Sequence, residues 1–165
     1  MASKGTPATA LLTREKVAFT THTYDVDVQT PNYGSAVAAA IGADPDRVFK
    51  TLVAEVDGRL TVGIVPVSGD LDLKALAAAA GGRKAAMAAP SDAVRVTGYV
   101  VGGISPFGQR TRLPMYLDRS ATDWPTIYVS GGRRGLQIEV SPVDLLLATG
   151  AVSAPIANPQ LPKRL

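Results

Sequence analysis

The chain contains no cysteine and only one histidine, His22, in its 165 residues. Without cysteine it can form no disulfide framework, no thiolate metal site and no cysteine nucleophile. A single histidine rules out a histidine-based metal cluster, and any Ser-His-Asp triad would have to include His22. We therefore expect no metal site, and most hydrolase templates are disfavoured.

Long apolar runs and a strong charge of either sign are also lacking. The first residues have no apolar stretch typical of a signal peptide, and no run approaches the roughly 20 residues that cross a bilayer. The 17 basic and 14 acidic residues give a formal net charge of +3, which permits a nucleic-acid partner without requiring one. We expect a cytoplasmic protein without a membrane partner.

Signals for helices and strands alternate along the chain without an internal repeat. Thr6 before Pro7 predicts the N-cap and first position of a helix, and Gly42 predicts the end of another. Asp57-Gly58 predicts a hairpin turn. The expected helices cover residues 6–17, 33–42, 68–81, 90–97 and 141–149. The expected strands lie at 19–26, on both sides of the hairpin turn within 46–67, and at 83–88, 115–118, 126–130 and 136–140.

These six or seven short strands, mostly in hairpins and interspersed with helices, indicate an α+β domain with a mixed sheet. We expect the sheet to be partly closed, like a barrel, with short helices at its flanks. The length favours one domain, over residues 6–154, with flexible tails at 1–5 and 155–165. From Ala151 onward the chain is rich in proline and weakly patterned, which predicts a loosely held C-terminal segment.

Lys50 stands at the entrance of the first strand of the predicted hairpin. Alternation along the strand places it on one face with Leu52 and Ala54. A lysine in this place either extends its ammonium into water over an apolar stem or points it into a cavity, where it would stabilise an oxyanion. Periodicity leaves both interpretations open.

The loop GYVVGGISPFGQR contains the adjacent glycines Gly102 and Gly103. Glycines let the backbone approach a ligand and turn N–H groups toward an anion or a carbonyl, although the same residues also occur in simple turns. The loop has no Walker ending, and no GxGxxG spacing follows a strand, so a nucleotide cofactor is disfavoured.

The segment from Tyr128 to Val140 and the strand around His22 hold the remaining candidates. Ser130 is either a nucleophile or a turn cap, and the turn cap is the better interpretation because the G-x-S-x-G pattern is missing. Arg133 and Arg134 suit phosphate contacts, and a basic rim would also include Arg110 and Arg112, although exposed arginines at turns are common. His22 is best interpreted as structural, and Tyr24 on the same face either lines a pocket or packs.

Four segments in this order, THTYD, VFKTL, TGYVVGGISPFGQRTRLP and IYVSGGRRGL, resemble the YbaK/EbsC branch of the bacterial aminoacyl-tRNA editing domains. The resemblance covers about residues 6–154. It implies a free-standing editing enzyme without a cofactor that removes cysteine from mischarged tRNA(Pro), and possibly from tRNA(Cys), in complex with prolyl-tRNA synthetase. In that family's proposed chemistry the substrate thiol attacks the aminoacyl ester.

The resemblance also implies roles for individual residues. Lys50 matches the essential lysine of the family, which is expected to stabilise the transition state together with the glycine loop. The residues expected around the aminoacyl group are Tyr24, Gly102, Gly103, Ser130 and Gln137. Arg133 and Arg134 are expected to contact tRNA weakly.

Gln137 departs from the family pattern, which usually has an acidic residue at this position. A glutamine still accepts a hydrogen bond but supplies no charge, so the preferred amino acid stays open. Two rivals therefore remain. One is a deacylase that clears alanine or another small amino acid by water attack, and the other is a non-catalytic module that binds tRNA or a synthetase.

Overall fold

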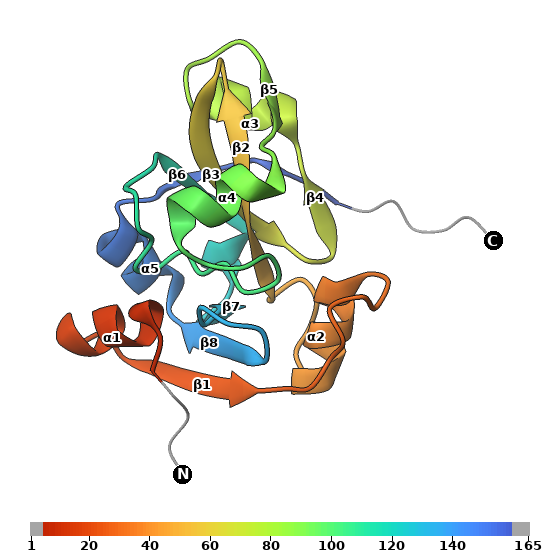
Figure 1. The fold of residues 1–165 in the computed structure, drawn as a ribbon, viewed down its shortest axis with the longest axis vertical. Coiled ribbons are helices and arrows are strands. Elements are labelled where there is room, and N and C mark those ends of the chain that lie inside the picture. The colour runs from red at the N-terminus through yellow and green to blue at the C-terminus, as the bar shows by residue number, and fades with distance from the viewer. Residues whose placement is uncertain (1–4, 160–165) are drawn as a thin grey trace.

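The computed structural model describes residues 5–159, which form a mixed α+β fold with five α-helices and three β-sheets (Figure 1). The helices are α1 (Pro7–Arg14), α2 (Tyr33–Ile41), α3 (Leu73–Ala79), α4 (Pro90–Thr97) and α5 (Pro142–Thr149). The longer strands are β1 (Phe19–Thr23), β2 (Phe49–Val56), β3 (Arg59–Pro66), β6 (Met115–Asp118), β7 (Ile127–Ser130) and β8 (Leu136–Val140). Three-residue strands are β4 (Gly69–Leu71), β5 (Ala85–Met87), β9 (Val152–Ala154) and β10 (Ala157–Pro159). Over residues 5–159, no helix is both long and apolar enough to span a membrane.

The largest sheet has the strand order β5-β2-β3-β6-β9. Strands β2 and β3 form the predicted hairpin, whose turn residues Asp57 and Gly58 have φ of +50° and +83°. Such positive φ values match the hairpin turns whose twist fits the flanking strands, so this prediction is confirmed. Strand β6 runs parallel to β3, and β9 runs parallel to β6.

The other two sheets are smaller, with the orders β1-β8-β7 and β10-β4. A single parallel bridge between Val48 and Tyr128 joins the start of β2 to β7. The described strands thus form three open sheets with one bridge between two of them. Closure into a barrel, which the sequence led us to expect, is not seen.

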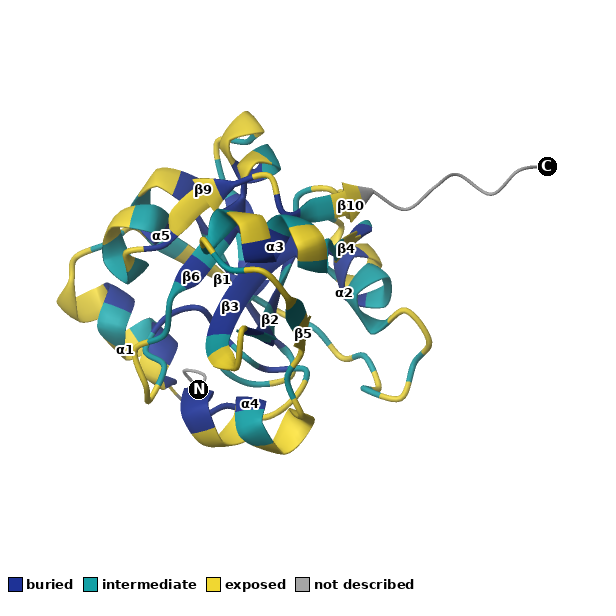
Figure 2. Cartoon of the chain, turned by 90° about the horizontal axis from the view of Figure 1, so that it is seen from above, coloured by how far each residue is buried: buried dark blue, intermediate teal, exposed yellow. Residues whose placement is uncertain are grey.

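Strand β2 is covered on both faces. Phe49 and Val53 pack in the main core, whereas Ala54 and Val56 pack in a second cluster with the buried Leu76 of α3. The alternation expected for the Lys50 strand is therefore confirmed. The neighbouring strand β3 is also buried along most of its length, as its dark blue colour in Figure 2 shows.

The helix signals identified all five helices, but the bounds of two of them differ from those expected. Thr6 caps α1 through a reciprocal bond with Thr9, as the Thr-Pro pair predicts, but the helix ends at Arg14 rather than at residue 17. The expected helix at 68–81 is shorter too, because its first residues form β4 and Asp72 caps α3 instead. Helix α1 ends just before Lys16, which has a positive φ of 58°, and α3 starts late because residues 69–71 form β4.

The prediction of a loosely held segment from Ala151 is wrong for residues 151–159. Strand β9 pairs with β6, and β10 pairs with β4. Between them Ile156 is fully buried in the second core cluster. Three-residue strands have no readable alternation, and their partners are distant in sequence, so no local pattern indicates them. The other residues of the expected tails, 1–4 and 160–165, lie outside the described part of the chain.

Asp118 holds this C-terminal segment against β6. Its Oδ1 accepts hydrogen bonds from the backbone N–H groups of Ile156 and Ala157, each at 2.9 Å. Its Oδ2 accepts from the N–H and the hydroxyl of Ser120, at 3.1 and 2.6 Å. One buried carboxylate therefore satisfies four donors from two segments.

Replacing Asp118 with alanine should lower the free energy of unfolding by about 2–3 kcal/mol, because it leaves buried donors unpaired. Urea denaturation of wild type and Asp118→Ala checks this. Asp123→Ala is the matched control, because Asp123 is an exposed aspartate of the adjacent 3₁₀ turn and should change the midpoint little. Equal effects of the two substitutions would contradict the role of Asp118.

Candidate functional site

A cavity of about 420 Å³ opens beside the first half of β2. Its walls come from β2, α2, β5, α4, the glycine loop and the β7–β8 strand pair. Four residues singled out from the sequence line it together: Lys50, Gly102, Ser130 and Gln137. Segments that are up to 87 positions apart in the chain, from Lys50 to Gln137, thus meet around one space.

The cavity lies along an unpaired edge of β2. Strand β5 pairs with β2 only from Ala54 onward, and the pairing of β7 with this part of the chain is limited to the Val48–Tyr128 bridge. Five consecutive residues between these contacts, 49–53, line the cavity. Because a free strand edge exposes backbone N–H and C=O groups, this wall offers both hydrogen-bond donors and acceptors.

The backbone of Thr51 faces this edge. In an antiparallel ladder alternate residues turn their N–H and C=O groups toward opposite neighbours. The C=O of Val53 points away from β3, since it accepts from the N–H of Ala88 at 3.1 Å. Thr51 has the same parity, so its N–H and C=O groups point away from β3 toward the cavity.

Two buried side-chain oxygens in the cavity wall have no hydrogen-bond partner within residues 5–159: Thr51 Oγ1 and Gln137 Oε1. Thr51 is 8% exposed and Gln137 is 6% exposed. Leaving a buried polar group unpaired costs about 1–3 kcal/mol, so such atoms call for a ligand or water. Sequence reasoning missed Thr51, because alternation assigns it to the face opposite Lys50 and gives no sign that the strand edge is open.

Lys50 lies at the rim of the cavity with its side chain 32% exposed. Its ammonium is 3.4 Å from Oδ1 of Asp70 on β4. Lys50 therefore borders the cavity, and its ammonium lies beside an exposed carboxylate.

The glycine loop is packed closely against the β7–β8 turn. Gly102 has a φ of +85°, and a Cβ there would lie 3.1 Å from Val28. Gly103 is not among the lining residues, and a Cβ there would lie 2.9 Å from the backbone of Arg133. Gly102 therefore borders the cavity, while Gly103 allows the loop to approach the neighbouring turn.

The four candidate arginines lie in different places. Arg134 donates from Nε to the C=O of Val101 at 2.9 Å, which ties the loop beside Gly102 to the β7–β8 turn. Arg133 is at the same turn and does not line the cavity. Arg110 contacts the end of α4 near Gly98, and Arg112 lies beside Gly150 after α5. Arg133 and Arg134 lie together at the β7–β8 turn, whereas Arg110 and Arg112 lie elsewhere. These contacts do not produce a continuous rim of four arginines.

Tyr24 does not line the cavity but supports a tyrosine that does. Its hydroxyl is 3.1 Å from the hydroxyl of Tyr33, which lies in the cavity wall at the start of α2. Burial and the hydrogen bond with Tyr24 raise the pKa of Tyr33, while the charge of Arg134 acts in the opposite direction. Tyr33 is thus a neutral phenol near neutral pH. No sequence signal indicated its place in the cavity, because Tyr33 is simply the first residue of a predicted helix.

Within residues 5–159, Ser130 makes no hydrogen bond to a catalytic base. Its Oγ accepts a hydrogen bond from the N–H of Gly132 at 3.3 Å, which is the turn-capping contact expected from its position. His22, the one available histidine, is bound to Glu139 at 2.9 Å. The contacts of the described chain therefore favour a binding role for Ser130 over a Ser-His nucleophile.

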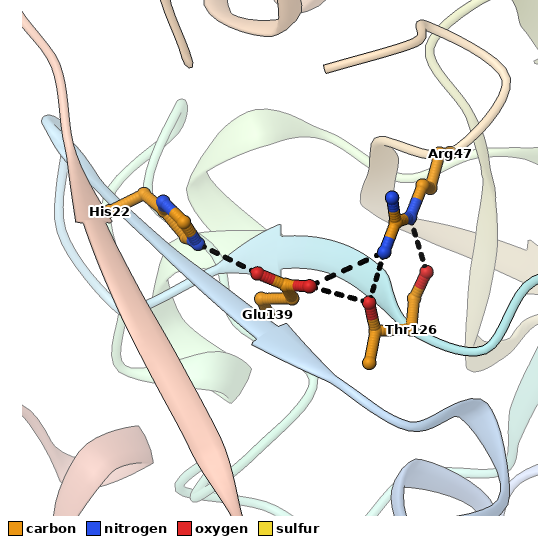
Figure 3. A network of polar contacts seen from close by, with 4 residues as sticks. All are labelled: His22, Arg47, Thr126 and Glu139. Carbon is orange, nitrogen blue, oxygen red and sulfur yellow. Dashed lines mark hydrogen bonds and ion pairs between the residues drawn. The ribbon is translucent and has the colours of Figure 1, made fainter. Parts of the chain in front are cut away.

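His22 belongs to a polar network that joins the two larger sheets (Figure 3). Glu139 of β8 accepts from Thr126 Oγ1 at 2.6 Å and pairs with His22 of β1 and Arg47 before β2. Arg47 also donates to the C=O of Thr126 at 2.6 Å, and its guanidinium lies 5.1 Å from the ring centre of Tyr128. The structural interpretation of His22 is confirmed.

The hydrogen bond from Thr126 lowers the pKa of Glu139, with further lowering by His22 and Arg47, although burial acts in the opposite direction. A carboxylate whose pKa is lowered by folding stabilises the protein above its ordinary pKa of 4.5. This contribution is lost as the pH falls through the lower folded value.

Glu139→Gln should therefore reduce the free energy of unfolding at pH 7 and flatten its decline below pH 4.5 relative to wild type. Urea midpoints measured between neutral and acidic pH check this. Glu15→Gln is the control, because Glu15 is exposed at the end of α1. A pH dependence as steep in Glu139→Gln as in wild type would contradict the assignment.

The fold is that of an aminoacyl-tRNA editing domain. The profile of the aminoacyl-tRNA editing domain matches residues 29–147, and the chain belongs to this family. The chain is 40% identical over 126 residues to EbsC of Enterococcus faecalis, a proposed Cys-tRNA(Pro)/Cys-tRNA(Cys) deacylase. That alignment covers 74% of this chain and 76% of EbsC.

Two solved structures share the fold. A proposed trans-editing enzyme for prolyl-tRNA synthetase superposes with a TM-score of 0.79 at 26% identity, over 94% of this chain and 99% of that one. The hypothetical protein APE2540 superposes with a TM-score of 0.81 at 24% identity, over 92% of this chain and 99% of that one. The second similarity concerns the fold alone.

Proposed function

We propose that the protein is a trans-editing aminoacyl-tRNA deacylase that clears cysteine from mischarged tRNA(Pro). The observation that carries this proposal is a cavity whose wall includes Lys50 and two residues with an unpaired buried oxygen, Thr51 and Gln137, in a chain of the editing family. Its volume of about 420 Å³ falls within the range of small-molecule sites. The ligand must supply hydrogen-bond donors, and an aminoacyl ester does so through its α-ammonium.

In the proposed complex the α-ammonium donates to Thr51 Oγ1 and Gln137 Oε1. The ester carbonyl then lies near the ammonium of Lys50 and the backbone N–H groups of the β2 edge, which stabilise the developing oxyanion. The terminal phosphates approach Arg133 and Arg134. Because Gln137 is neutral, it selects the amine by hydrogen bonding and not by charge.

The chemical step needs no nucleophile from the protein. The cysteine sulfur forms a bond to the ester carbonyl, the bond from that carbon to the ribose oxygen breaks, and the thiol proton ends on that oxygen. Free tRNA and a cyclic thiolactone leave, and water later opens the thiolactone. The protein contributes positioning and charge stabilisation, which agrees with its lack of cysteine and with the engagement of its one histidine elsewhere.

Such an enzyme has a physical reason to exist. Cysteine is close to proline in size, and a synthetase pocket discriminates weakly between side chains of similar volume. A second site that recognises the cysteine thiol by its reactivity removes the error. The net charge of only +3 provides little electrostatic attraction to tRNA. We therefore expect the protein to act in a complex with prolyl-tRNA synthetase, which supplies the tRNA selectivity. We expect this complex to act in the cytoplasm.

Lys50→Ala should lower the single-turnover rate on Cys-tRNA(Pro) about hundredfold to thousandfold, as loss of one oxyanion donor does. Lys50→Arg, which keeps the charge, should retain part of the rate. Lys74→Ala is the control, because Lys74 is an exposed lysine of α3 and should leave the rate unchanged. Deacylation of labelled Cys-tRNA(Pro) by the isolated protein, with and without prolyl-tRNA synthetase, measures the effect.

The same assay with other aminoacyl groups tests the mechanism. Ser-tRNA(Pro) carries a hydroxyl in place of the thiol and Ala-tRNA(Pro) carries neither, so both should react far more slowly than Cys-tRNA(Pro). Equal rates on the cysteine and serine substrates would overturn thiol attack and favour water attack. No deacylation of any substrate, with tRNA binding retained, would favour a non-catalytic module.

Thr51→Val should lower kcat/KM about tenfold to hundredfold, because a hydrogen bond to a charged group is worth about 1.5–3 kcal/mol. The free protein should keep its stability, since the removed hydroxyl has no partner there. Thr61→Val is the matched control on β3. Its buried hydroxyl donates to the C=O of Arg59 at 3.1 Å and lies outside the cavity, so this variant should lose stability and keep activity.

A further inference from the structure

Lys50, which borders the cavity, forms an ion pair with Asp70 of β4, and β4 pairs with the C-terminal strand β10. We propose that Asp70 is a positioning residue for Lys50, and that strand β10 holds Asp70 in place. This inference rests on the proposed function for its effect on catalysis, and on contacts within the free protein for its geometry.

Asp70 is the one carboxylate within 4 Å of the Lys50 ammonium among residues 5–159. The two side chains come from different strands, since Lys50 is on β2 and Asp70 is on β4. A lysine side chain has a flexible four-carbon stem, so its ammonium samples many positions unless a contact fixes it. The contact with Asp70 therefore restricts the position of the Lys50 ammonium.

Strand β4 depends on β10 for its position. Within the described strands its pairing partner is β10, with Asp70 opposite Asn158 in the register. The N–H of Asp72 donates to the C=O of Ile156 at 2.7 Å. In an antiparallel ladder every second pair is hydrogen-bonded, so Asn158 and Asp70 form the next hydrogen-bonded pair.

Strand β10 is in turn held by the protein core. Asp118 binds the N–H groups of Ile156 and Ala157, and the side chain of Ile156 is fully buried. A continuous chain of contacts thus runs from Asp118 through β10 and Asp70 to Lys50. Strand β10 is thus linked indirectly to Lys50, although it does not line the cavity.

The size of the effect follows from exposure. Asp70 is 71% exposed, and its oxygen is 3.4 Å from the ammonium, so the ion pair is weak. An exposed ion pair changes the equilibrium between paired and unpaired side chains by up to roughly fivefold. Orientation of Lys50 by Asp70 can therefore change the reaction rate by no more than about this factor.

Asp70→Asn should lower kcat for Cys-tRNA(Pro) about three- to fivefold and leave KM nearly unchanged. Asp70→Glu should recover part of the loss, since it restores the carboxylate. The control is Asp92→Asn, which removes a different exposed ion pair, that of Asp92 with Arg95. An unchanged or increased kcat in Asp70→Asn would overturn the proposal.

The role of β10 is tested by a pair of variants at Asn158. Asn158→Pro removes the backbone N–H that pairs with Asp70, whereas Asn158→Ala keeps it. The proline variant should lower kcat as Asp70→Asn does, and the alanine variant should not. Combined with Asp70→Asn, Asn158→Pro should add little, because both act through the same carboxylate. Additive effects would overturn the link through β10.

A readout that does not use activity separates this inference from the proposed function. The rate at which an acylating reagent modifies Lys50, measured by mass spectrometry relative to Lys74, should rise in Asp70→Asn and Asn158→Pro. It should stay at the wild-type value in Asn158→Ala and Asp92→Asn. If wild type deacylates no substrate while these rates change, the proposed function fails and the positioning of Lys50 stands. Unchanged rates in all variants would overturn the positioning.

Discussion

The candidate site depends on one junction, the parallel bridge between Val48 and Tyr128 that joins the start of β2 to β7. The N–H of Tyr128 donates to the C=O of Arg47 at 3.1 Å, and the Arg47 guanidinium is held by Glu139 and Thr126. Because the strands run parallel at this point, Lys50 and Ser130 both lie two residues beyond the bridge. The strands separate there, and the cavity occupies the space between them.

Two features of this cavity would be unfavourable elsewhere in a fold. An unpaired strand edge is a site for unwanted pairing, and a buried hydroxyl or amide oxygen without a partner costs free energy. Here the edge of β2 borders a cavity, and Thr51 and Gln137, which each have a buried oxygen without a partner within residues 5–159, belong to the wall of the same cavity. A ligand with N–H donors would offset the cost of the unpaired oxygens, and the α-ammonium of the proposed aminoacyl group supplies such donors.

Local chemistry made most of the elements predictable. The capped start of α1, the Asp57-Gly58 hairpin and the Gly42 and Gly150 helix ends follow from side chains and backbone preferences within a few residues. The strands β4, β9 and β10 were not predictable, because three residues carry no periodic signal and their partners lie far along the chain. Asp118, which organises the last two, reads in sequence as an ordinary aspartate at the end of a strand.

The sequence by itself determined the family, the strand that carries Lys50 and the group of candidates Gly102, Ser130 and Gln137, because motif and alternation are properties of short segments. Only the tertiary structure decided that these residues border one cavity, that Thr51 and Tyr33 join them, and that Gly103 and Tyr24 support the wall from behind. It also decided that Asp70 meets Lys50. Those outcomes depend on which strand edges remain unpaired and on contacts between distant segments, which no local pattern records.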